Sequence, residues 1–130
     1  MPACDVSVLV WTRNNASLVT KCLAHLEEQA HPAAHYEVVV VDDGSDHETY
    51  ARIARYAAGA PMRVQALRSD GRGAARARNL ALNAATGRYV LFLDEELLAG
   101  PWLIERHLAV QAAHGGEAAT VGSVQRHPEM

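Results

Sequence analysis

Two acidic clusters in this chain each follow directly on a run of apolar residues. Asp42 and Asp43 come immediately after the valine run Val38–Val41. The second cluster, Asp94–Glu96, follows the run Tyr89–Leu93 in the same way. Carboxylate oxygens are the preferred ligands of hard divalent cations and are strong hydrogen-bond acceptors. Both clusters therefore qualify as candidate sites for a metal ion or a polar ligand.

Three arginines, Arg72, Arg76 and Arg78, lie between the acidic clusters, where Gly71 and Gly73 precede an expected helix. Guanidinium groups and the free backbone N–H groups of a helix start both bind phosphate. Alternatively, the arginines form the solvated face of that helix, and we expect this of at least one of them. Nucleic acid is excluded as a partner, because no aromatic residues are interleaved with the arginines and the formal net charge is -3.

The valine run is expected to form a strand that is buried on both faces of a parallel sheet, since no polar residue alternates with the valines. Ser45 and Glu48 form a capping-box pattern for a helix over about 46–58. Asp42 and Asp43 then lie at the carboxyl end of the strand, where open α/β sheets bind ligands. The alternative for this pair is an Asx turn that only caps the helix. The second acidic cluster favours a binding role for Asp43, while Asp42 is as well explained as a support of the turn.

The rest of the chain alternates strand and helix patterns, which predicts an α/β fold: a mostly parallel, doubly wound Rossmann-like sheet with helices on both faces. The chain of 130 residues is expected to form a single domain over 1–130. Further strands are expected at 6–11, 63–67, 89–93 (buried on both sides) and, weakly, 118–124; helices are expected from a cap at Asn15 or Ser17 to Pro32, over about 74–85 with Gly87 closing it, and from Pro101 to Gly115.

Composition and terminal sequence indicate a cytoplasmic protein. Cys4 and Cys22 have no repeated spacing and are expected to be free, buried thiols. No apolar stretch reaches the roughly 20 residues of a membrane helix, and the amino terminus lacks the pattern of a signal peptide. The seven histidines show no metal-ligand spacing, so we expect them on the surface.

Three polar segments are expected to meet at the carboxyl edge of this sheet. These are the loop that begins with Thr12 and Arg13, the Asp42–Asp43 turn, and the Asp94–Glu96 turn. Within the last turn, Glu95 is expected to face solvent. A signalling receiver domain also pairs acidic residues in such a sheet, but its pair follows the first strand, where this chain has Thr12 and Arg13.

Taken together, these segments resemble a known family. The first strand with its TRNN loop, the VVVVDDGSD turn and the GAARARNLALNAATGRYVLFLDEE block occur in the order found in the nucleotide-sugar-binding half of family 2 glycosyltransferases of the GT-A fold. The resemblance extends from Val6 to about Val124. It implies a Rossmann-like GT-A sheet that binds a nucleotide diphosphate sugar.

The resemblance also implies roles for single residues. Asp43 stands where the family contacts the nucleobase, and an ionised carboxylate there would accept the N–H of a uracil edge. Asp94 and Glu96 stand at the acidic positions of the DxD motif, which holds a divalent metal, Mn²⁺ or Mg²⁺, on the donor diphosphate. Arg13 replaces the aromatic residue usual in the first loop, and Arg78 with Asn79 matches the family's Arg-Asn pair. The candidate donor-binding residues are Thr12, Arg13, Asp42, Asp43, Arg76, Arg78, Asn79 and Asp94, and the candidate metal ligands are Asp94 and Glu96.

Two functions follow from this resemblance. The first is the donor-binding domain of an inverting, metal-dependent glycosyltransferase that uses a nucleotide sugar, expected to be a UDP-sugar, with an unknown acceptor. The second is a non-catalytic nucleotide-sugar-binding or interaction module on the same fold, which could form a homo-oligomer. Family members continue into an acceptor-binding half that supplies the general base, so whether this chain is an enzyme is left open, and no residue is assigned as that base.

Overall fold

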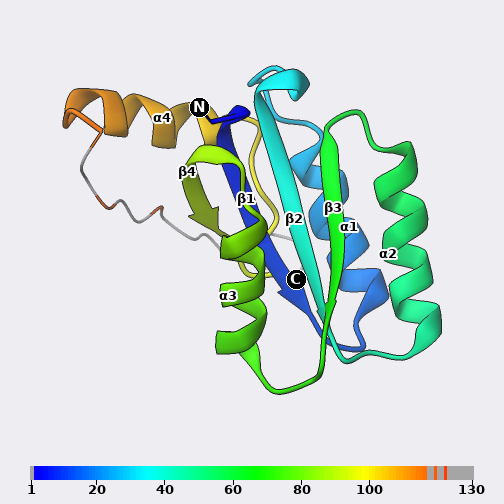
Figure 1. Cartoon of the computed structure of the whole chain (residues 1–130). Coiled ribbons are helices and arrows are strands. Elements are labelled where there is room, and N and C mark those ends of the chain that lie inside the picture. The colour runs from blue at the N-terminus through cyan, green and yellow to red at the C-terminus, as the bar shows by residue number, and fades with distance from the viewer. Residues whose placement is uncertain (1, 117–118, 120–121, 123–130) are drawn as a thin grey trace.

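A four-stranded parallel sheet forms the centre of the computed structural model, which describes residues 2–116, 119 and 122 (Figure 1). The strand order is β3-β2-β1-β4, so the chain winds outward in one direction and then crosses to the other side of β1. The described strands are β1 (Cys4–Thr12), β2 (Tyr36–Asp43), β3 (Arg63–Ser69) and β4 (Gly87–Phe92). The expected doubly wound α/β sheet is confirmed, and within the described residues every strand pair is parallel.

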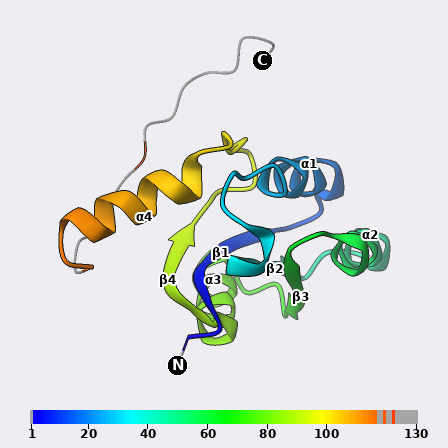
Figure 2. The ribbon, with the colours of Figure 1, turned by 90° about the horizontal axis from the view of Figure 1, so that it is seen from above.

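Helices cover both faces of this sheet. The helices are α1 (Ala16–Leu26), α2 (His47–Gly59), α3 (Ala74–Ala84) and α4 (Leu103–Ala113), with a short 3₁₀ turn, η1 (Ala33–His35), before β2. Residues of α1, α2 and α4 pack into one apolar cluster with Val8, Val10, Val38 and Val40. Helix α3 packs on the opposite face, where Ala77 and Ala81 contact Leu9, Val39 and Val41. Figure 2 shows α3 on the other side of the strands from α1 and α4.

Strand β2 is the most buried element of the molecule. Every one of its residues is buried, from Tyr36 to Asp43, because β1 and β3 pair with its two edges and helices cover its two faces. The valine run shows no polar alternation because neither face of this strand is in contact with solvent. Because the strand extends to Asp43, both carboxylates belong to the strand itself and not to the turn after it.

A buried polar cluster fastens the amino ends of the strands. Glu37, with 1% of its surface exposed, accepts hydrogen bonds from Ser7 Oγ (2.6 Å), Gln65 Nε2 (2.9 Å) and the backbone N–H of Thr86 (2.7 Å). Ser7 Oγ in turn accepts the N–H of Gly87 at 2.8 Å. The cluster therefore joins β1, β2 and β3 to the start of β4.

Several expected boundaries are wrong. The N-cap of α2 is Asp46, whose carboxylate accepts the N–H of Thr49 at 2.8 Å, and Ser45 instead accepts the N–H of Asn14. Helix α1 ends at Leu26, before Pro32 is reached. Helix α3 ends at Ala84, and Gly87 is the first residue of β4.

Strand β4 is not buried on both sides as expected. Its residues alternate between partly buried and exposed, with Phe92 53% exposed, because β4 pairs only with β1 among the described strands. The weak strand at 118–124 lies outside the described residues except for Ala119 and Gly122. No helix in the described part of the chain is long and apolar enough to cross a membrane. Both cysteines are free, Cys22 buried and Cys4 only partly so.

Candidate functional site

The carboxyl ends of β1, β2 and β3 bring the first two polar segments together, as the sequence predicts. Thr12 pairs in register with Asp42, and Asp43 pairs with Ser69 at the end of β3. Because successive strand residues point to opposite faces, Asp42 and Asp43 have different surroundings. Asp42 faces the side of α2, and Asp43 faces the start of α3.

Asp42 holds the turn after β2. Its Oδ1 accepts the backbone N–H of Ser45 at 3.0 Å, and its side chain is fully buried. Oδ2 has no hydrogen-bond partner but lies 3.7 Å from Nε of Arg68, which also donates to the backbone oxygen of Ser45 and stacks on the ring of Tyr50. These contacts fit the supporting role considered for Asp42.

Asp43 is bound to the loop that leads into α3. Its Oδ1 accepts a hydrogen bond from Ser69 Oγ at 2.7 Å, and its Oδ2 accepts the N–H of Gly73 at 3.2 Å. Only 1% of Asp43 is exposed. Ser69 was not among the predicted site residues, although its place two residues after the apolar part of a strand, which ends at Leu67, is a signal that could have found it.

The loop after β1 lies across the same edge. Asn14 adopts a positive φ of 51° and ties this loop to the β2 turn, because its N–H donates to Ser45 Oγ at 2.7 Å and its Oδ1 accepts the N–H of Asp46 at 3.1 Å. Arg13 reaches the next loop, with its Nη1 3.5 Å from the carbonyl oxygen of Gly71. Arg13 is exposed, as a side chain that contacts a ligand must be.

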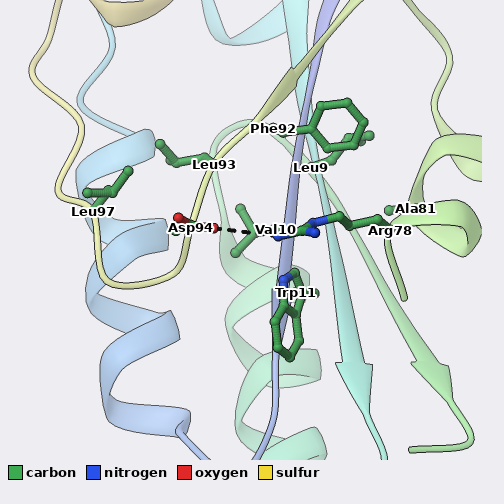
Figure 3. Close-up of a pocket in the computed structure, with 9 residues that line it drawn as sticks. All are labelled: Leu9, Val10, Trp11, Arg78, Ala81, Phe92, Leu93, Asp94 and Leu97. Atoms are coloured by element: carbon green, nitrogen blue, oxygen red, sulfur yellow. Dashed lines mark ion pairs between the residues drawn. The ribbon is translucent and has the colours of Figure 1, made fainter. Parts of the chain in front are cut away.

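A cavity of about 410 Å³ opens between β1, β4 and α3, where the winding of the sheet changes direction (Figure 3). In open α/β sheets this switch point is where ligands bind. Arg78 of α3 and Asp94 after β4 lie at this cavity with Nη2 and Oδ1 4.0 Å apart. The lining is otherwise apolar and consists of Leu9, Val10, Trp11, Ala81, Phe92, Leu93 and Leu97.

The other predicted basic residues do not line this cavity. Arg76 and Arg72 both pair with Asp70, at 3.5 Å and 3.0 Å. Asn79 is exposed on α3 next to Arg78. The structure therefore groups Arg78 with Asp94, and it groups Arg72 and Arg76 with the loop after β3.

The three carboxylates of the turn after β4 point in two directions, two toward solvent and one toward the core. Asp94 is 61% exposed and Glu96 is exposed as well. Glu95 was expected to face solvent, and this is wrong: its Oε2 is buried without a hydrogen-bond partner, and its charge acts on Cys22 of α1. Burial raises the pKa of the Glu95 carboxyl, with smaller contributions from Glu96 and Asp94, while Thr12 acts in the opposite sense. Burial, together with Glu95, also raises the pKa of Cys22 to about 12.

The exposed carboxylates of Asp94 and Glu96 fit a site in which a bound ligand supplies the remaining oxygens around a divalent cation. Among the described residues no group of three or more His, Cys, Asp or Glu side chains could hold a metal by itself. Mg²⁺ and similar ions are commonly held by one or two carboxylates, with water and substrate phosphates as the other ligands. Asp94 and Glu96 offer such oxygens at an open turn, so the donor set agrees with an ion shared with a phosphate ligand.

Comparison with known proteins gives consistent matches over nearly all of the chain. The sequence model of "Glycosyl transferase family 2" matches residues 7–129. The poly(ribitol-phosphate) β-N-acetylglucosaminyltransferase TarS of Staphylococcus aureus is 37% identical over 90 residues, which are 69% of this chain and 16% of TarS. Validoxylamine A glucosyltransferase of Streptomyces hygroscopicus is 34% identical over 113 residues, which cover 87% of this chain and 26% of that protein.

Solved structures match as well. The crystal structure of TarS 1-349 in complex with UDP has a TM-score of 0.76 and 29% identity, covering 85% of this chain and 33% of that one. The mannosyltransferase PcManGT from Pyrobaculum calidifontis, in complex with GDP-Man and Mn²⁺, has a TM-score of 0.77 and 32% identity, covering 85% and 32%. The chain thus spans about a third or less of each of these proteins.

Proposed function

Since this chain belongs to glycosyl transferase family 2, we propose that it binds a nucleotide diphosphate sugar at the carboxyl edge of its sheet, as the donor-binding part of a metal-dependent, inverting glycosyltransferase. The observation that carries this proposal is the pairing of Arg78 with Asp94, 4.0 Å apart at the cavity of the switch point. UDP in TarS and GDP-Man with Mn²⁺ in PcManGT support the class of ligand. We expect a UDP-sugar, as the acidic turn after β2 implies.

The diphosphate would lie between the turn after β4 and the start of α3. Asp94 and Glu96 would hold Mn²⁺ or Mg²⁺, which when bound neutralises charge on the leaving diphosphate without proton transfer. Arg78 projects toward the same position, and a guanidinium group binds phosphate through two parallel hydrogen bonds. The exposure of Arg78 and Asp94 leaves both groups accessible to the ligand.

The nucleobase would lie toward Asp43. Both oxygens of Asp43 already accept a hydrogen bond from the protein, but each carboxylate oxygen can accept a second one. The side chain is covered in this structure, so base binding requires the segment around Gly71 and Gly73 to move aside. Thr12, Arg13, Asp42, Arg76 and Asn79 remain candidate contacts or supports of this site.

Titration calorimetry with UDP-GlcNAc, UDP-Glc and GDP-Man, each with and without Mn²⁺, tests the proposal. We expect a UDP-sugar to bind, with higher affinity when Mn²⁺ is present. Replacing Asp43 by Ala should weaken binding by about 1.5 to 3 kcal/mol, the usual contribution of a hydrogen bond to a charged group. Asp94→Ala should remove most of the effect of Mn²⁺ on binding.

Glu105→Ala is the matched control, because it removes an exposed carboxylate from α4, away from the sheet edge. This variant should bind like the parent chain. If no nucleotide sugar binds at millimolar concentration, with or without Mn²⁺, the proposal is wrong.

The alternative function is a non-catalytic nucleotide-sugar-binding module on the same fold. The chain spans only 16% of TarS and about a third of the solved relatives, so it corresponds to only part of them. Turnover separates the two functions. Release of UDP from a bound UDP-sugar by this chain alone would exclude the non-catalytic function, whereas tight binding without release would favour it.

A further inference from the structure

The turn that carries the exposed carboxylates has a buried side as well. It is closed by a hydrogen bond of 3.0 Å from the N–H of Leu97 to the carbonyl oxygen of Asp94. The residue before the turn is joined to β1 by the hydrogen bond from the N–H of Leu93 to the carbonyl oxygen of Leu9, also 3.0 Å. Glu95 follows Leu93 and Asp94, and its side chain turns back toward the core.

The Glu95 side chain meets the end of β1. Its Oε2 and the Oγ1 of Thr12 are both buried, and in the described part of the chain they are two of three buried side-chain nitrogen or oxygen atoms without a hydrogen-bond partner. In the register of β1 with β4, Leu9 lies opposite Phe92, so Thr12 and Glu95 each follow three residues after the same strand pair, and Thr12 also lowers the pKa of the Glu95 carboxyl. No hydrogen bond joins Thr12 Oγ1 to Glu95 Oε2 in this structure. Buried polar atoms without partners are rare because they lose their hydration and gain nothing in return. A small rotation that joins this hydroxyl to this carboxyl satisfies both atoms.

We propose that Glu95 is a positioning residue for the donor site: a hydrogen bond between Glu95 and Thr12, formed by this small rotation, fastens the turn after β4 to the end of β1 and keeps Asp94 and Glu96 directed outward. The effect on donor and metal binding rests on the proposed function, whereas the attachment of the turn to β1 does not. The inner oxygen of Glu95, Oε2, has no access to solvent, so this oxygen contacts neither a metal ion nor a substrate here.

Three variants separate this role from alternatives. Glu95→Ala removes the contact, and Thr12→Val removes the hydroxyl while keeping a β-branched side chain of similar size. Glu95→Gln keeps the shape of the side chain and can still form a hydrogen bond with the Thr12 hydroxyl. Glu105→Ala again serves as the control for loss of an exposed carboxylate.

Hydrogen exchange of the Leu97 amide, measured by NMR without any ligand, reports whether the turn is fastened. We expect exchange at Leu97 to accelerate at least tenfold in Glu95→Ala and Thr12→Val, and less than threefold in Glu95→Gln and the control, with the amides of β2 unchanged in all four. Equal exchange in the parent chain and in Glu95→Ala overturns the proposal. If Glu95→Ala does not fold, Thr12→Val decides it by the same criterion.

The functional consequence is measured as the binding of Mn²⁺ with UDP, followed by electron paramagnetic resonance of the ion. Glu95→Ala and Thr12→Val should weaken Mn²⁺ binding at least tenfold, and Glu95→Gln should restore it to within threefold of the parent chain. Wild-type affinity in a folded Glu95→Ala variant overturns the positioning role. If the parent chain itself does not bind Mn²⁺ with UDP, the proposed function fails, and the exchange experiment still decides whether Glu95 fastens the turn.

Discussion

Neighbouring carboxylates of this protein have different surroundings because adjacent residues point to opposite sides of the sheet. Asp42 is bound to the turn over α2, while Asp43 is bound to the loop before α3. The same division recurs after β4, where Asp94 lies at the cavity and Glu95 points toward α1. One side of the sheet edge therefore holds the candidate binding groups, and the other holds the groups that support them.

Glu37 is the residue whose ionisation should stabilise the fold most directly. Burial alone would raise its pKa, but hydrogen bonds from Ser7, Thr86 and Gln65 outweigh burial, and the pKa is lowered from its usual value of 4.5. The guanidinium of Arg63 lies 3.9 Å from Oε1 of Glu37. The ionised form thus stabilises the fold above about pH 4.5, and this stabilisation is lost as the pH falls through the lower folded-state pKa.

We expect Glu37→Gln to reduce the free energy of unfolding at pH 7 by about 2 kcal/mol, because its NH₂ group would face buried donors. Urea unfolding from pH 7 to pH 3 measures this. The difference between parent and variant should shrink as the pH falls below about 4.5, since protonation then removes the charge from the parent as well. Glu105→Gln should show no such difference, and a difference for Glu37→Gln that stays constant with pH would contradict the assignment.

At the scale of elements, two glycines set how closely the β2 turn approaches the loop before α3. Gly44 has a φ of 76°, and a Cβ built on it would lie 2.7 Å from the Cα of Gly71. Gly44→Ala is therefore expected to destabilise the fold by about 2 kcal/mol, through backbone strain and collision with backbone atoms. Urea unfolding at pH 7 measures the change.

Gly59, the last residue of α2, provides the matched control. A Cβ there would meet no atom within 4 Å, so Gly59→Ala should be neutral or slightly stabilising. If the two variants were equally stable, the contact between Gly44 and Gly71 would not constrain the turn.

The existence and order of the elements were predictable from two sequence patterns. Uninterrupted β-branched runs follow from strands that are buried in a parallel sheet, and apolar residues at three-and-four spacing follow from helices that pack one face against it. The local ends were less predictable. Ser45 and Asp46 both fit an N-cap, and the choice depends on Asn14, which comes from another loop and occupies Ser45. Strand β4 has the apolar sequence of a buried strand, but the topology places it last in the order of the described strands, and Phe92 is exposed.

The candidate site was predictable only in part, for a related reason. The sequence indicated that the carboxylates gather at one sheet edge, because all parallel strands end there. It did not indicate which carboxylate is covered. Ser69 contacts Asp43 through strand pairing, and Glu95 is buried by a turn whose direction depends on β1. Both contacts are set by tertiary structure: the sequence places Ser69 near the end of a strand, but it does not show that Ser69 binds Asp43 or that Glu95 is buried.

At the scale of the whole molecule, protection should fall from the centre of the sheet to its edge. Strand β2 is buried along its whole length and paired on both sides. Strand β4 pairs only with β1 among the described strands, and alternate residues are exposed. Local opening costs more where backbone hydrogen bonds are buried under packed side chains. The amides of β2 should therefore exchange slowest and those of β4 fastest among the strands.

Hydrogen exchange followed by mass spectrometry, at two protein concentrations, measures this order. The expected outcome is slow exchange for peptides covering Tyr36–Asp43 and exchange at least tenfold faster for peptides covering Gly87–Phe92, at both concentrations. An edge strand offers unpaired backbone groups to another chain, so a second copy bound to β4 would slow exchange there as the concentration rises. Protection of β4 equal to that of β2 at the lower concentration would contradict the expectation that β4, which pairs only with β1 among the described strands, opens more readily.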